Sequence, residues 1–339
     1  MGVEFIPITG DPPIRGALGG GHPVNIARDS ILSVSESSFV ALRSRTGVSE
    51  LARAQPLVEI VLISIEEQQE SGSRVHEFWA RDFNLHGGPM RAFARAYDVS
   101  EDGNSLLAAI DVVEADGDER EPVRHFMMSF ELSTGTVTDV QEVDFAEILP
   151  CREVTACSID GVFSAPDGWL VAVRGYHAVS NAVNEPIGFV FAQYAPHANN
   201  SFFGIHEHFR QGRRMSRRSR SVVKDDHLVA LVASEMGVPM PNEQLIAYEV
   251  DTGRVLSGPD VGRSHGIHIL DESDVVLVWS YDRGLVAYEL STLAEIGTVP
   301  VPWRVPADEI IVFAEFFGTS TFLIAARDGR YAIVRLSGA

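Results

Sequence analysis

One short sequence motif recurs along this chain and constrains its fold more than any other feature of the sequence. Each copy is a polar turn followed by a run of β-forming apolar residues. The six copies are SESSFVAL from Ser35, SEDGNSLLAAI from Ser100, SAPDGWLVAV from Ser164, VKDDHLVALV from Val223, LDESDVVLVW from Leu270 and FGTSTFLIAA from Phe317. Repetition every ~45 to 65 residues indicates structural units that bury their apolar faces against one another.

A second predicted strand follows each copy of the motif, and in three of the repeated units this strand ends in closely similar sequences. These are FELSTGTV from Phe130, YEVDTGRV from Tyr248 and YELSTLAEIGTV from Tyr288. Ser-Thr-Gly and Asp-Thr-Gly favour hairpin turns, because Gly supplies a positive φ and Ser or Asp bonds back to the backbone. With one more strand before the motif, each unit becomes a four-stranded antiparallel sheet with strands a to d. The pattern predicts an all-β chain folded as a single β-propeller.

The spacing of the units predicts about six blades in one domain that spans residues 1–339, with seven blades as the alternative. The units begin near residues 22, 90, 151, 215, 262 and 307. The last unit ends in RYAIVRLSGA with only three strands, whereas VEFIPIT at the start of the chain belongs to no unit. We therefore expect residues 3–9 to form the outer strand of the last blade and to close the ring, which leaves no exposed sheet edge there.

The sequence of the repeat also resembles the repeats of a known superfamily. Ser-x-Asp-Gly before an apolar strand, followed by Tyr-x-Val-Asp-Thr-Gly, is similar to the repeats of YVTN and WD40-like propellers. The resemblance covers most of the chain and implies a propeller fold. The Gly-His and Trp-Asp signatures of WD40 repeats and the aromatic motifs of quinoprotein repeats are absent, so the resemblance implies no particular activity.

Composition narrows the possible partners and location. The formal net charge is −20, so we expect no binding to nucleic acid or to anionic membranes. The chain has no apolar run of the roughly 18 residues that a membrane helix needs, and its first segment lacks a signal-peptide core. Its two cysteines, Cys151 and Cys157, do not suffice for a disulfide framework. We expect a cytoplasmic protein.

A propeller sorts its loops onto two faces, and the unusual residues of this chain gather on one of them. The a-to-b and c-to-d turns, here called the turn face, are short and look structural. The d-to-a and b-to-c loops, here called the loop-rich face, are longer, richer in Gly and Pro, and carry most of the histidines. Because functional residues concentrate on loops held by a rigid scaffold, we expect the site on the loop-rich face, around the central channel.

Histidines on the loop-rich face suggest one kind of site. His22, His86 and His265 each stand beside glycine just before an innermost strand, so their side chains could converge on the channel mouth. Imidazoles from separate blades would suit a divalent transition metal or acid–base catalysis. Alternatively, each histidine caps a loop. His206 and His208, two residues apart, share one face of a strand and form a second, weaker candidate for metal ligation.

Other residues of the loop-rich face suggest ligand contacts. His177 and Tyr176 lie in RGYHAVSNAVNEP, which we expect to be a covering loop at the rim. Trp303 and Arg304 are held between prolines, and such an aromatic can stack against a flat ligand or a partner's side chain. Asp308 follows them as a candidate general base.

An arginine-rich segment runs against the acidic character of the chain. Arg213, Arg214 and Arg217 belong to FRQGRRMSRRSRS, which predicts either an anion or acidic-partner site or a solvated loop paired with nearby carboxylates.

Two function hypotheses follow. The first is a binding propeller that recognises a protein or a small ligand on the loop-rich face. The alternative is an enzyme of the lyase, hydrolase or isomerase type, with the histidines and a metal at the channel mouth. The chain has no Walker loop, nucleophile elbow, HExxH or paired CxxC motif, so the motifs do not decide between them.

Overall fold

The structure is a computed structural model that describes most strands of the chain and the turns between many of them. The described residues are 2–8, 31–35, 38–44, 56–64, 73–85, 90–114, 124–145, 148, 156–165, 168–180, 183–196, 202–208, 214–215, 222–224, 227–233, 242–249, 252, 254–262, 264–270, 274–280, 283–299, 315–317, 321–325 and 331–337. Most of them lie in strands, and the 3-10 turn η2 (Ala80–Phe83) interrupts one connection. Within these ranges no helix has the length and apolarity to cross a bilayer.

The described strands form antiparallel sheets, named here sheets 1 to 6. Sheet 1 contains β2 (Ile31–Ser35), β3 (Ser38–Ser44), β4 (Val58–Ser64) and β5 (Ser73–Phe78). Sheet 2 contains β6 (Met90–Val99), β7 (Ser105–Glu114), β8 (Arg124–Glu131) and β9 (Thr136–Glu142). Sheet 3 contains β10 (Ala156–Ala165), β11 (Gly168–Ser180), β12 (Val183–Tyr194) and β13 (Phe202–His208).

The remaining sheets depart in two places from a simple run of four consecutive strands. In sheet 4, β14 (Arg214–Met215) and β15 (Val222–Lys224) both pair with β16 (His227–Ala233), which is followed by β17 (Glu243–Glu249) and β18 (Val255–Gly262). Sheet 5 contains β19 (Ser264–Leu270), β20 (Val275–Ser280), β21 (Gly284–Glu289) and β22 (Glu295–Val299). Sheet 6 contains β23 (Glu315–Phe317), β24 (Thr321–Ala325), β25 (Tyr331–Ser337) and β1 (Gly2–Ile8).

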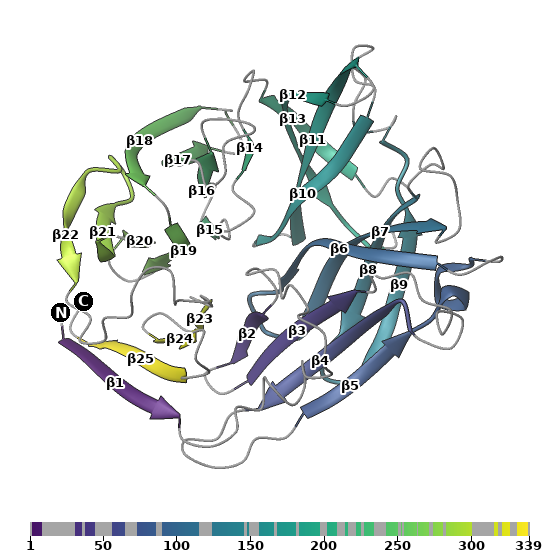
Figure 1. The fold of residues 1–339 in the computed structure, drawn as a ribbon, viewed down its shortest axis with the longest axis horizontal. Coiled ribbons are helices and arrows are strands. Elements are labelled where there is room, and N and C mark those ends of the chain that lie inside the picture. Colours follow the sequence, from purple (N-terminus) through teal and green to yellow (C-terminus); the bar gives the residue numbers. More distant parts are fainter. Residues whose placement is uncertain are drawn as a thin grey trace.

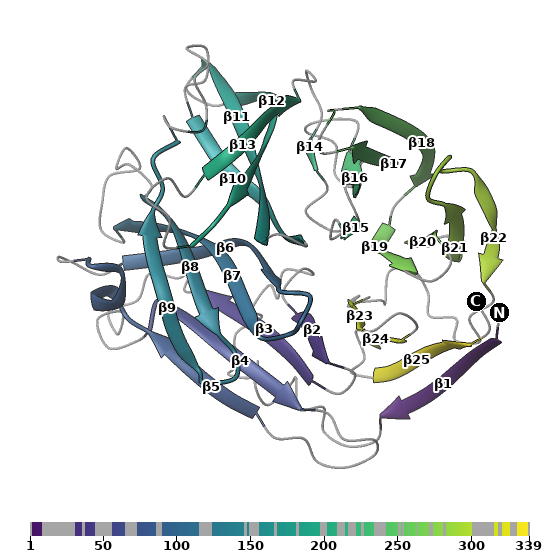
Figure 2. The same cartoon turned by 180° about the vertical axis from the view of Figure 1, so that it is seen from behind.

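The sheets are arranged around a ring (Figure 1), and the view from behind shows the same order (Figure 2). Strands β2, β15, β19 and β23 lie toward the centre, and β1, β5, β18 and β22 lie toward the outside. The N-terminal strand β1 pairs with β25 from Gly2 opposite Ser337 to Ile8 opposite Tyr331. This all-β ring of small antiparallel sheets is a β-propeller, the fold that the repeat predicts.

The core lies between neighbouring sheets. Strand β7 shows why the second half of the repeated motif is a continuous apolar run. Leu106 and Ala108 belong to the core cluster that includes residues of sheet 1, whereas Leu107 and Ala109 belong to the cluster that includes residues of sheet 3. Side chains alternate between the two faces of a strand. A strand covered on both faces must therefore be apolar at every position rather than at every second one.

The turn between β6 and β7 explains the polar first half of the motif. The Ser100 hydroxyl donates to Asp102 (2.6 Å), and the Asn104 backbone N–H donates to the same carboxylate (3.0 Å). These bonds lower the pKa of Asp102 to about 2. Gly103 has a φ of 71°, and a Cβ there would lie 2.5 Å from the backbone oxygen of Val34 in sheet 1. Glycine is therefore required at this point of the turn.

One predicted loop is a hairpin instead. The sequence RGYHAVSNAVNEP predicts a cover for the rim, but β11 continues to Ser180 and β12 begins at Val183. Tyr176 lies opposite Pro186, and His177 lies opposite Glu185. The glycine, proline and small polar residues that look like loop signals are absorbed by register shifts in the ladder. The prediction of a covering loop is wrong, and Tyr176 and His177 lie on a long hairpin of sheet 3.

Candidate functional site

About half of the predicted site residues fall on described strands. His265 lies on β19, His206 and His208 on β13, Arg214 on β14, and Tyr176 and His177 on β11. The others lie outside the described residues, namely His22, His86, Arg213, Arg217, Trp303, Arg304 and Asp308. The convergence of His22, His86 and His265 on the channel therefore stays a prediction. In the part of the chain that the structure describes, no group of three or more His, Cys, Asp or Glu side chains could hold a metal ion.

A β-bulge recurs at the same place on three innermost strands. The register shifts between Ala94 and Ala96 on β6, between Ile159 and Gly161 on β10, and between Ser264 and Gly266 on β19. In each case the extra residue is ionisable, and the three are Arg95, Asp160 and His265. Bulges re-aim side chains and are over-represented beside active sites. His265 is a predicted site residue, whereas the positions of Arg95 and Asp160 depend on a pairing irregularity that no local pattern announces.

Sheet 4 departs from regular pairing at the corresponding place. Met215 on β14 pairs with Val232, and Val222 on β15 pairs with Val229, so two separate short strands pair with β16, and residues 216–221 between them lie outside the described residues. The sequence of that interval is SRRSRS, the second half of the arginine-rich segment.

In sheet 2 the bulged residue belongs to a buried charge cluster. The Arg95 Nε donates to one oxygen of Asp111 in a short hydrogen bond, and His125 Nδ1 lies 2.6 Å from the other oxygen. The side chain of Asp111 is 3% exposed, whereas that of Arg95 is 32% exposed. Burial alone would raise the pKa of Asp111, but the His125 hydrogen bond and the Arg95 charge outweigh it and hold this pKa below its usual value. Asp111 is therefore an ionised anchor.

Sheet 3 carries an ion pair between its first two strands, β10 and β11, which correspond to β6 and β7 of sheet 2, with the charges reversed. Arg174 on β11 donates through Nη2 to Asp160 Oδ1 at 2.7 Å, and both side chains are at most 4% exposed. The inner strand thus supplies the cation in sheet 2 and the anion in sheet 3. Removing one partner of such a buried pair is strongly destabilising, because the other charge is left without compensation.

Cys157 and Glu243 are two further reactive groups near these strands, the first partly buried and the second buried. Burial raises the pKa of the Cys157 thiol to about 11, so the reactive thiolate is scarce at neutral pH. The carboxylate of Glu243 accepts bonds from both the N–H and the hydroxyl of Ser264, next to His265. Glu243 and Ser264 are buried on different sheets, so their bonds tie sheet 4 to sheet 5.

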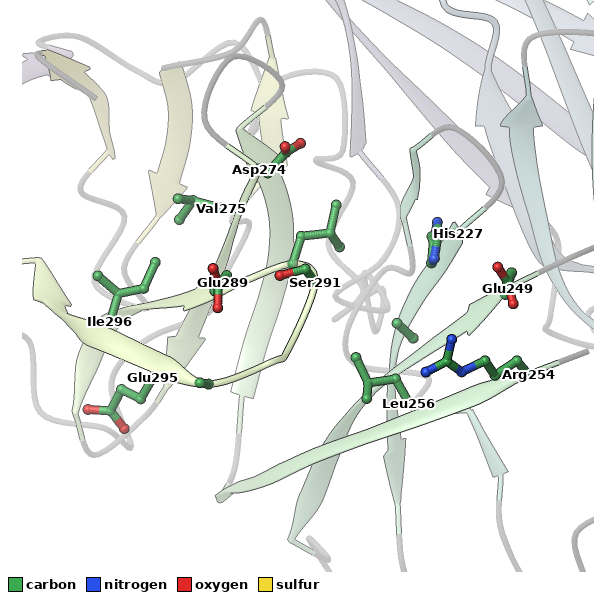
Figure 3. A pocket seen from close by; sticks show the side chains of 13 residues that line it. His227, Glu249, Arg254, Leu256, Asp274, Val275, Glu289, Ser291, Glu295 and Ile296 are labelled. Carbon is green, nitrogen blue, oxygen red and sulfur yellow. The ribbon is translucent and has the colours of Figure 1, made fainter.

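The turn face holds a pocket that the sequence did not indicate. It has a volume of about 780 Å³ and opens between sheets 4 and 5 (Figure 3). Glu249 ends β17 on one wall, and Glu289 ends β21 on the other. Both glutamates come from the similar hairpin sequences YEVDTGRV and YELSTLAEIGTV, which look like purely structural turns in the sequence. The Glu repeated in these two hairpins is a sequence signal for the pocket. It could not be interpreted from the sequence alone, because the pocket depends on how the two sheets pack.

The fold and these sites define the chain as a β-propeller protein. No known protein-family model matches the sequence, and neither does any curated protein. Similar solved structures include a chain of a mitotic checkpoint complex, with 8% identity, a TM-score of 0.44, and coverage of 91% of this chain and 90% of that chain. The WD40 β-propeller domain of Doa1 has 12% identity and a TM-score of 0.40 over 99% of this chain and 97% of that one.

A sialidase from Trypanosoma rangeli is also similar, with 11% identity and a TM-score of 0.48 over 91% of this chain. The present chain matches 54% of the sialidase, about half its length. Likenesses at such identities concern the fold and assign no activity to this chain.

Proposed function

We propose that this propeller is a binding protein that recognises a protein or a small ligand on its loop-rich face, around the central channel. The observation that carries the proposal is the bulge retained at one place on β6, β10 and β19, which puts Arg95, Asp160 and His265 on innermost strands. A pairing defect that recurs in separate repeats, each time with an ionisable residue, is a feature to be explained by use rather than by stability.

The pairing of the described charged groups favours binding over catalysis. Asp111 is held ionised by Arg95 and His125, and Asp160 is paired with Arg174. A general acid or base works best with a pKa near the working pH, whereas the pKa of Asp111 is shifted away from neutrality. Among these groups Arg95, whose side chain is 32% exposed, can instead present a fixed charge to a ligand.

The enzyme alternative retains one supporting observation. His265 occupies the bulge of β19, a position that suits a catalytic or metal-binding side chain. In this alternative His22, His86 and His265 hold a divalent transition metal at the channel mouth, with Asp308 or His177 as acid–base groups. The reaction would be of the lyase, hydrolase or isomerase type.

In the binding hypothesis the ligand contacts come from Trp303, Arg304, Tyr176 and the arginines 213, 214 and 217. The partner is a protein or small molecule rather than nucleic acid or a membrane, since the net charge is −20. A cytoplasmic location belongs to the same proposal.

Affinity capture with matched variants tests the binding hypothesis. The wild-type chain, a Trp303→Ala/Arg304→Ala variant and an outer-strand control, Glu142→Gln, are used as baits in extracts of the source cells, and bound proteins and metabolites are quantified. We expect a ligand that wild type and Glu142→Gln retain and the loop-rich-face variant loses. Equal retention by all three baits would contradict the proposed face.

Metal analysis of purified protein tests the enzyme alternative. Stoichiometric metal in the wild type, lost in a folded His22→Ala/His86→Ala/His265→Ala variant, would replace the binding proposal by the metalloenzyme. Metal-free, folded wild-type protein after expression in metal-supplemented medium would remove the metal-dependent form of the enzyme.

A further inference from the structure

The pocket between sheets 4 and 5 lies on the turn face, away from the loop-rich face discussed above. One wall is formed by His227 at the start of β16 and by Glu249 and Arg254 at the β17–β18 turn. The other wall is formed by Asp274, just before β20, and by Glu289 at the end of β21. Figure 3 shows these walls facing each other across the opening. A volume of about 780 Å³ falls within the roughly 300–1,000 Å³ typical of ligand sites.

The pocket offers an apolar seat. Leu256 and Leu290 line it and are partly buried against the core cluster between sheets 4 and 5. Ile296, on the outer strand β22, also lines it and is 60% exposed, the most exposed large hydrophobic side chain among the described residues. An apolar group on a ligand that covered these three side chains would remove apolar surface from water, which is favourable.

The pocket also holds two fixed carboxylates, one on each wall. The Thr252 hydroxyl donates to Glu249 in a short hydrogen bond, and the Thr292 hydroxyl donates to Glu289 at 2.6 Å. The same turn bond recurs in sheet 2, where the Thr134 hydroxyl donates to Glu131. Each bond holds a carboxylate in place, and since a carboxylate accepts about four hydrogen bonds, each retains capacity for a cationic donor.

Two other charged groups of the lining, Glu295 and Arg254, have different roles. Glu295 is engaged by Arg283 through two hydrogen bonds of 2.9 and 2.5 Å, so its charge is compensated within the protein. Arg254 makes no ion pair with any residue in the described ranges, and its guanidinium can donate to the carbonyl oxygens of an extended chain. The pocket thus combines an aliphatic patch, carboxylates on both walls and one guanidinium that can donate to the main chain of a ligand.

We propose that this pocket is a second binding site, and that it takes a short extended peptide segment of a partner protein in which an aliphatic residue adjoins a lysine or arginine. The aliphatic side chain packs on Leu256, Leu290 and Ile296. The cation lies between Glu249 and Glu289, and Arg254 donates to a peptide carbonyl. An interface of this size is small, so the binding is weak and sensitive to salt.

Fluorescence anisotropy with labelled hexapeptides tests the proposal on the full chain. The library has one aliphatic position followed by lysine or arginine, with the other positions varied, and a matched set has glutamate in place of the basic residue. We expect binders only in the basic set. The Glu249→Gln/Glu289→Gln variant, which keeps an acceptor for each threonine, and the Ile296→Ser variant each weaken binding by about tenfold or more, the loss of a charge-assisted bond or an apolar contact.

Two controls separate this site from the loop-rich face and from general acidity. Glu142→Gln removes an exposed carboxylate from the outer strand of sheet 2 and leaves peptide affinity unchanged, as does Trp303→Ala. Circular dichroism confirms that every variant is folded. The proposal is overturned if no basic peptide binds at millimolar concentration, if acidic peptides bind equally well, or if Glu142→Gln weakens binding as much as the pocket variants. None of these outcomes bears on the loop-rich face, which the Trp303→Ala/Arg304→Ala bait tests separately.

Discussion

Replacing Asp111 by asparagine tests whether the charge cluster of sheet 2 is a structural anchor. The carboxylate is 3% exposed and contacts both Arg95 and His125, and an asparagine side chain keeps its shape but removes the negative charge. Breaking a buried ion pair by removing one partner costs about 3–5 kcal/mol. Because the Arg95 side chain is 32% exposed, water compensates part of its charge, so we expect a loss of about 2–4 kcal/mol in the free energy of unfolding at pH 7.

The pH dependence has a definite sign. The folded-state pKa of Asp111 lies below the unfolded value of about 3.9, so the charged carboxylate stabilises the fold above that pH. This stability is lost as the pH falls through the lower, folded-state pKa. The difference between wild type and Asp111→Asn should therefore be full at pH 7 and shrink at pH 3 and below.

Urea unfolding at several pH values measures this difference, with Glu142→Gln as the matched control. Glu142 forms an exposed pair with Arg124, and pairs of that kind contribute about 0–1 kcal/mol. Equal losses for Asp111→Asn and Glu142→Gln at pH 7, or a difference that grows toward low pH, would refute the account of Asp111 as an ionised anchor.

Two further predictions concern packing and reactivity. Gly258→Ala would bring a Cβ to 2.8 Å from Leu293 Cβ and 3.0 Å from the Leu245 carbonyl oxygen, so we expect destabilisation of about 1–3 kcal/mol in urea unfolding, whereas Gly297→Ala meets nothing within 4 Å and should change stability little. Cys157, with its thiol pKa raised to about 11, should react with iodoacetamide at pH 8 far more slowly in the native than in the denatured protein; equal rates by peptide mass spectrometry would contradict its burial.

The sequence was sufficient for the parts of the fold that depend on local chemistry. The turn at Ser100 to Gly103 could be predicted because its hydroxyl, carboxylate and glycine act within a few residues of one another. The continuous apolar strands could be predicted because burial on both faces demands them.

Features that depend on pairing between strands or sheets could not be predicted. The bulges at Arg95 and Asp160 arise from the register of two strands, and neither residue differs locally from an ordinary strand residue. The hairpin through His177 looked like a loop because glycine, proline and asparagine usually end strands, whereas here the ladder continues through bulges. The pocket beside Glu289 exists only where sheets 4 and 5 meet.

The central claim is that the chain forms one closed ring, because every assignment of a loop to a face depends on it. Phe5 on β1 and Phe322 on β24 are both register partners of Val334 on β25. Partners in antiparallel strands have Cα atoms about 4.5–5.5 Å apart, which a disulfide can span.

Disulfide cross-linking measures this closure directly. In a background with Cys151 and Cys157 replaced by serine, we expect Phe5→Cys/Val334→Cys to oxidise in the native protein as readily as the control Phe322→Cys/Val334→Cys, as read by intact-mass spectrometry and non-reducing gels. A folded protein in which the control pair closes but the Phe5→Cys/Val334→Cys pair stays reduced would contradict the closed ring.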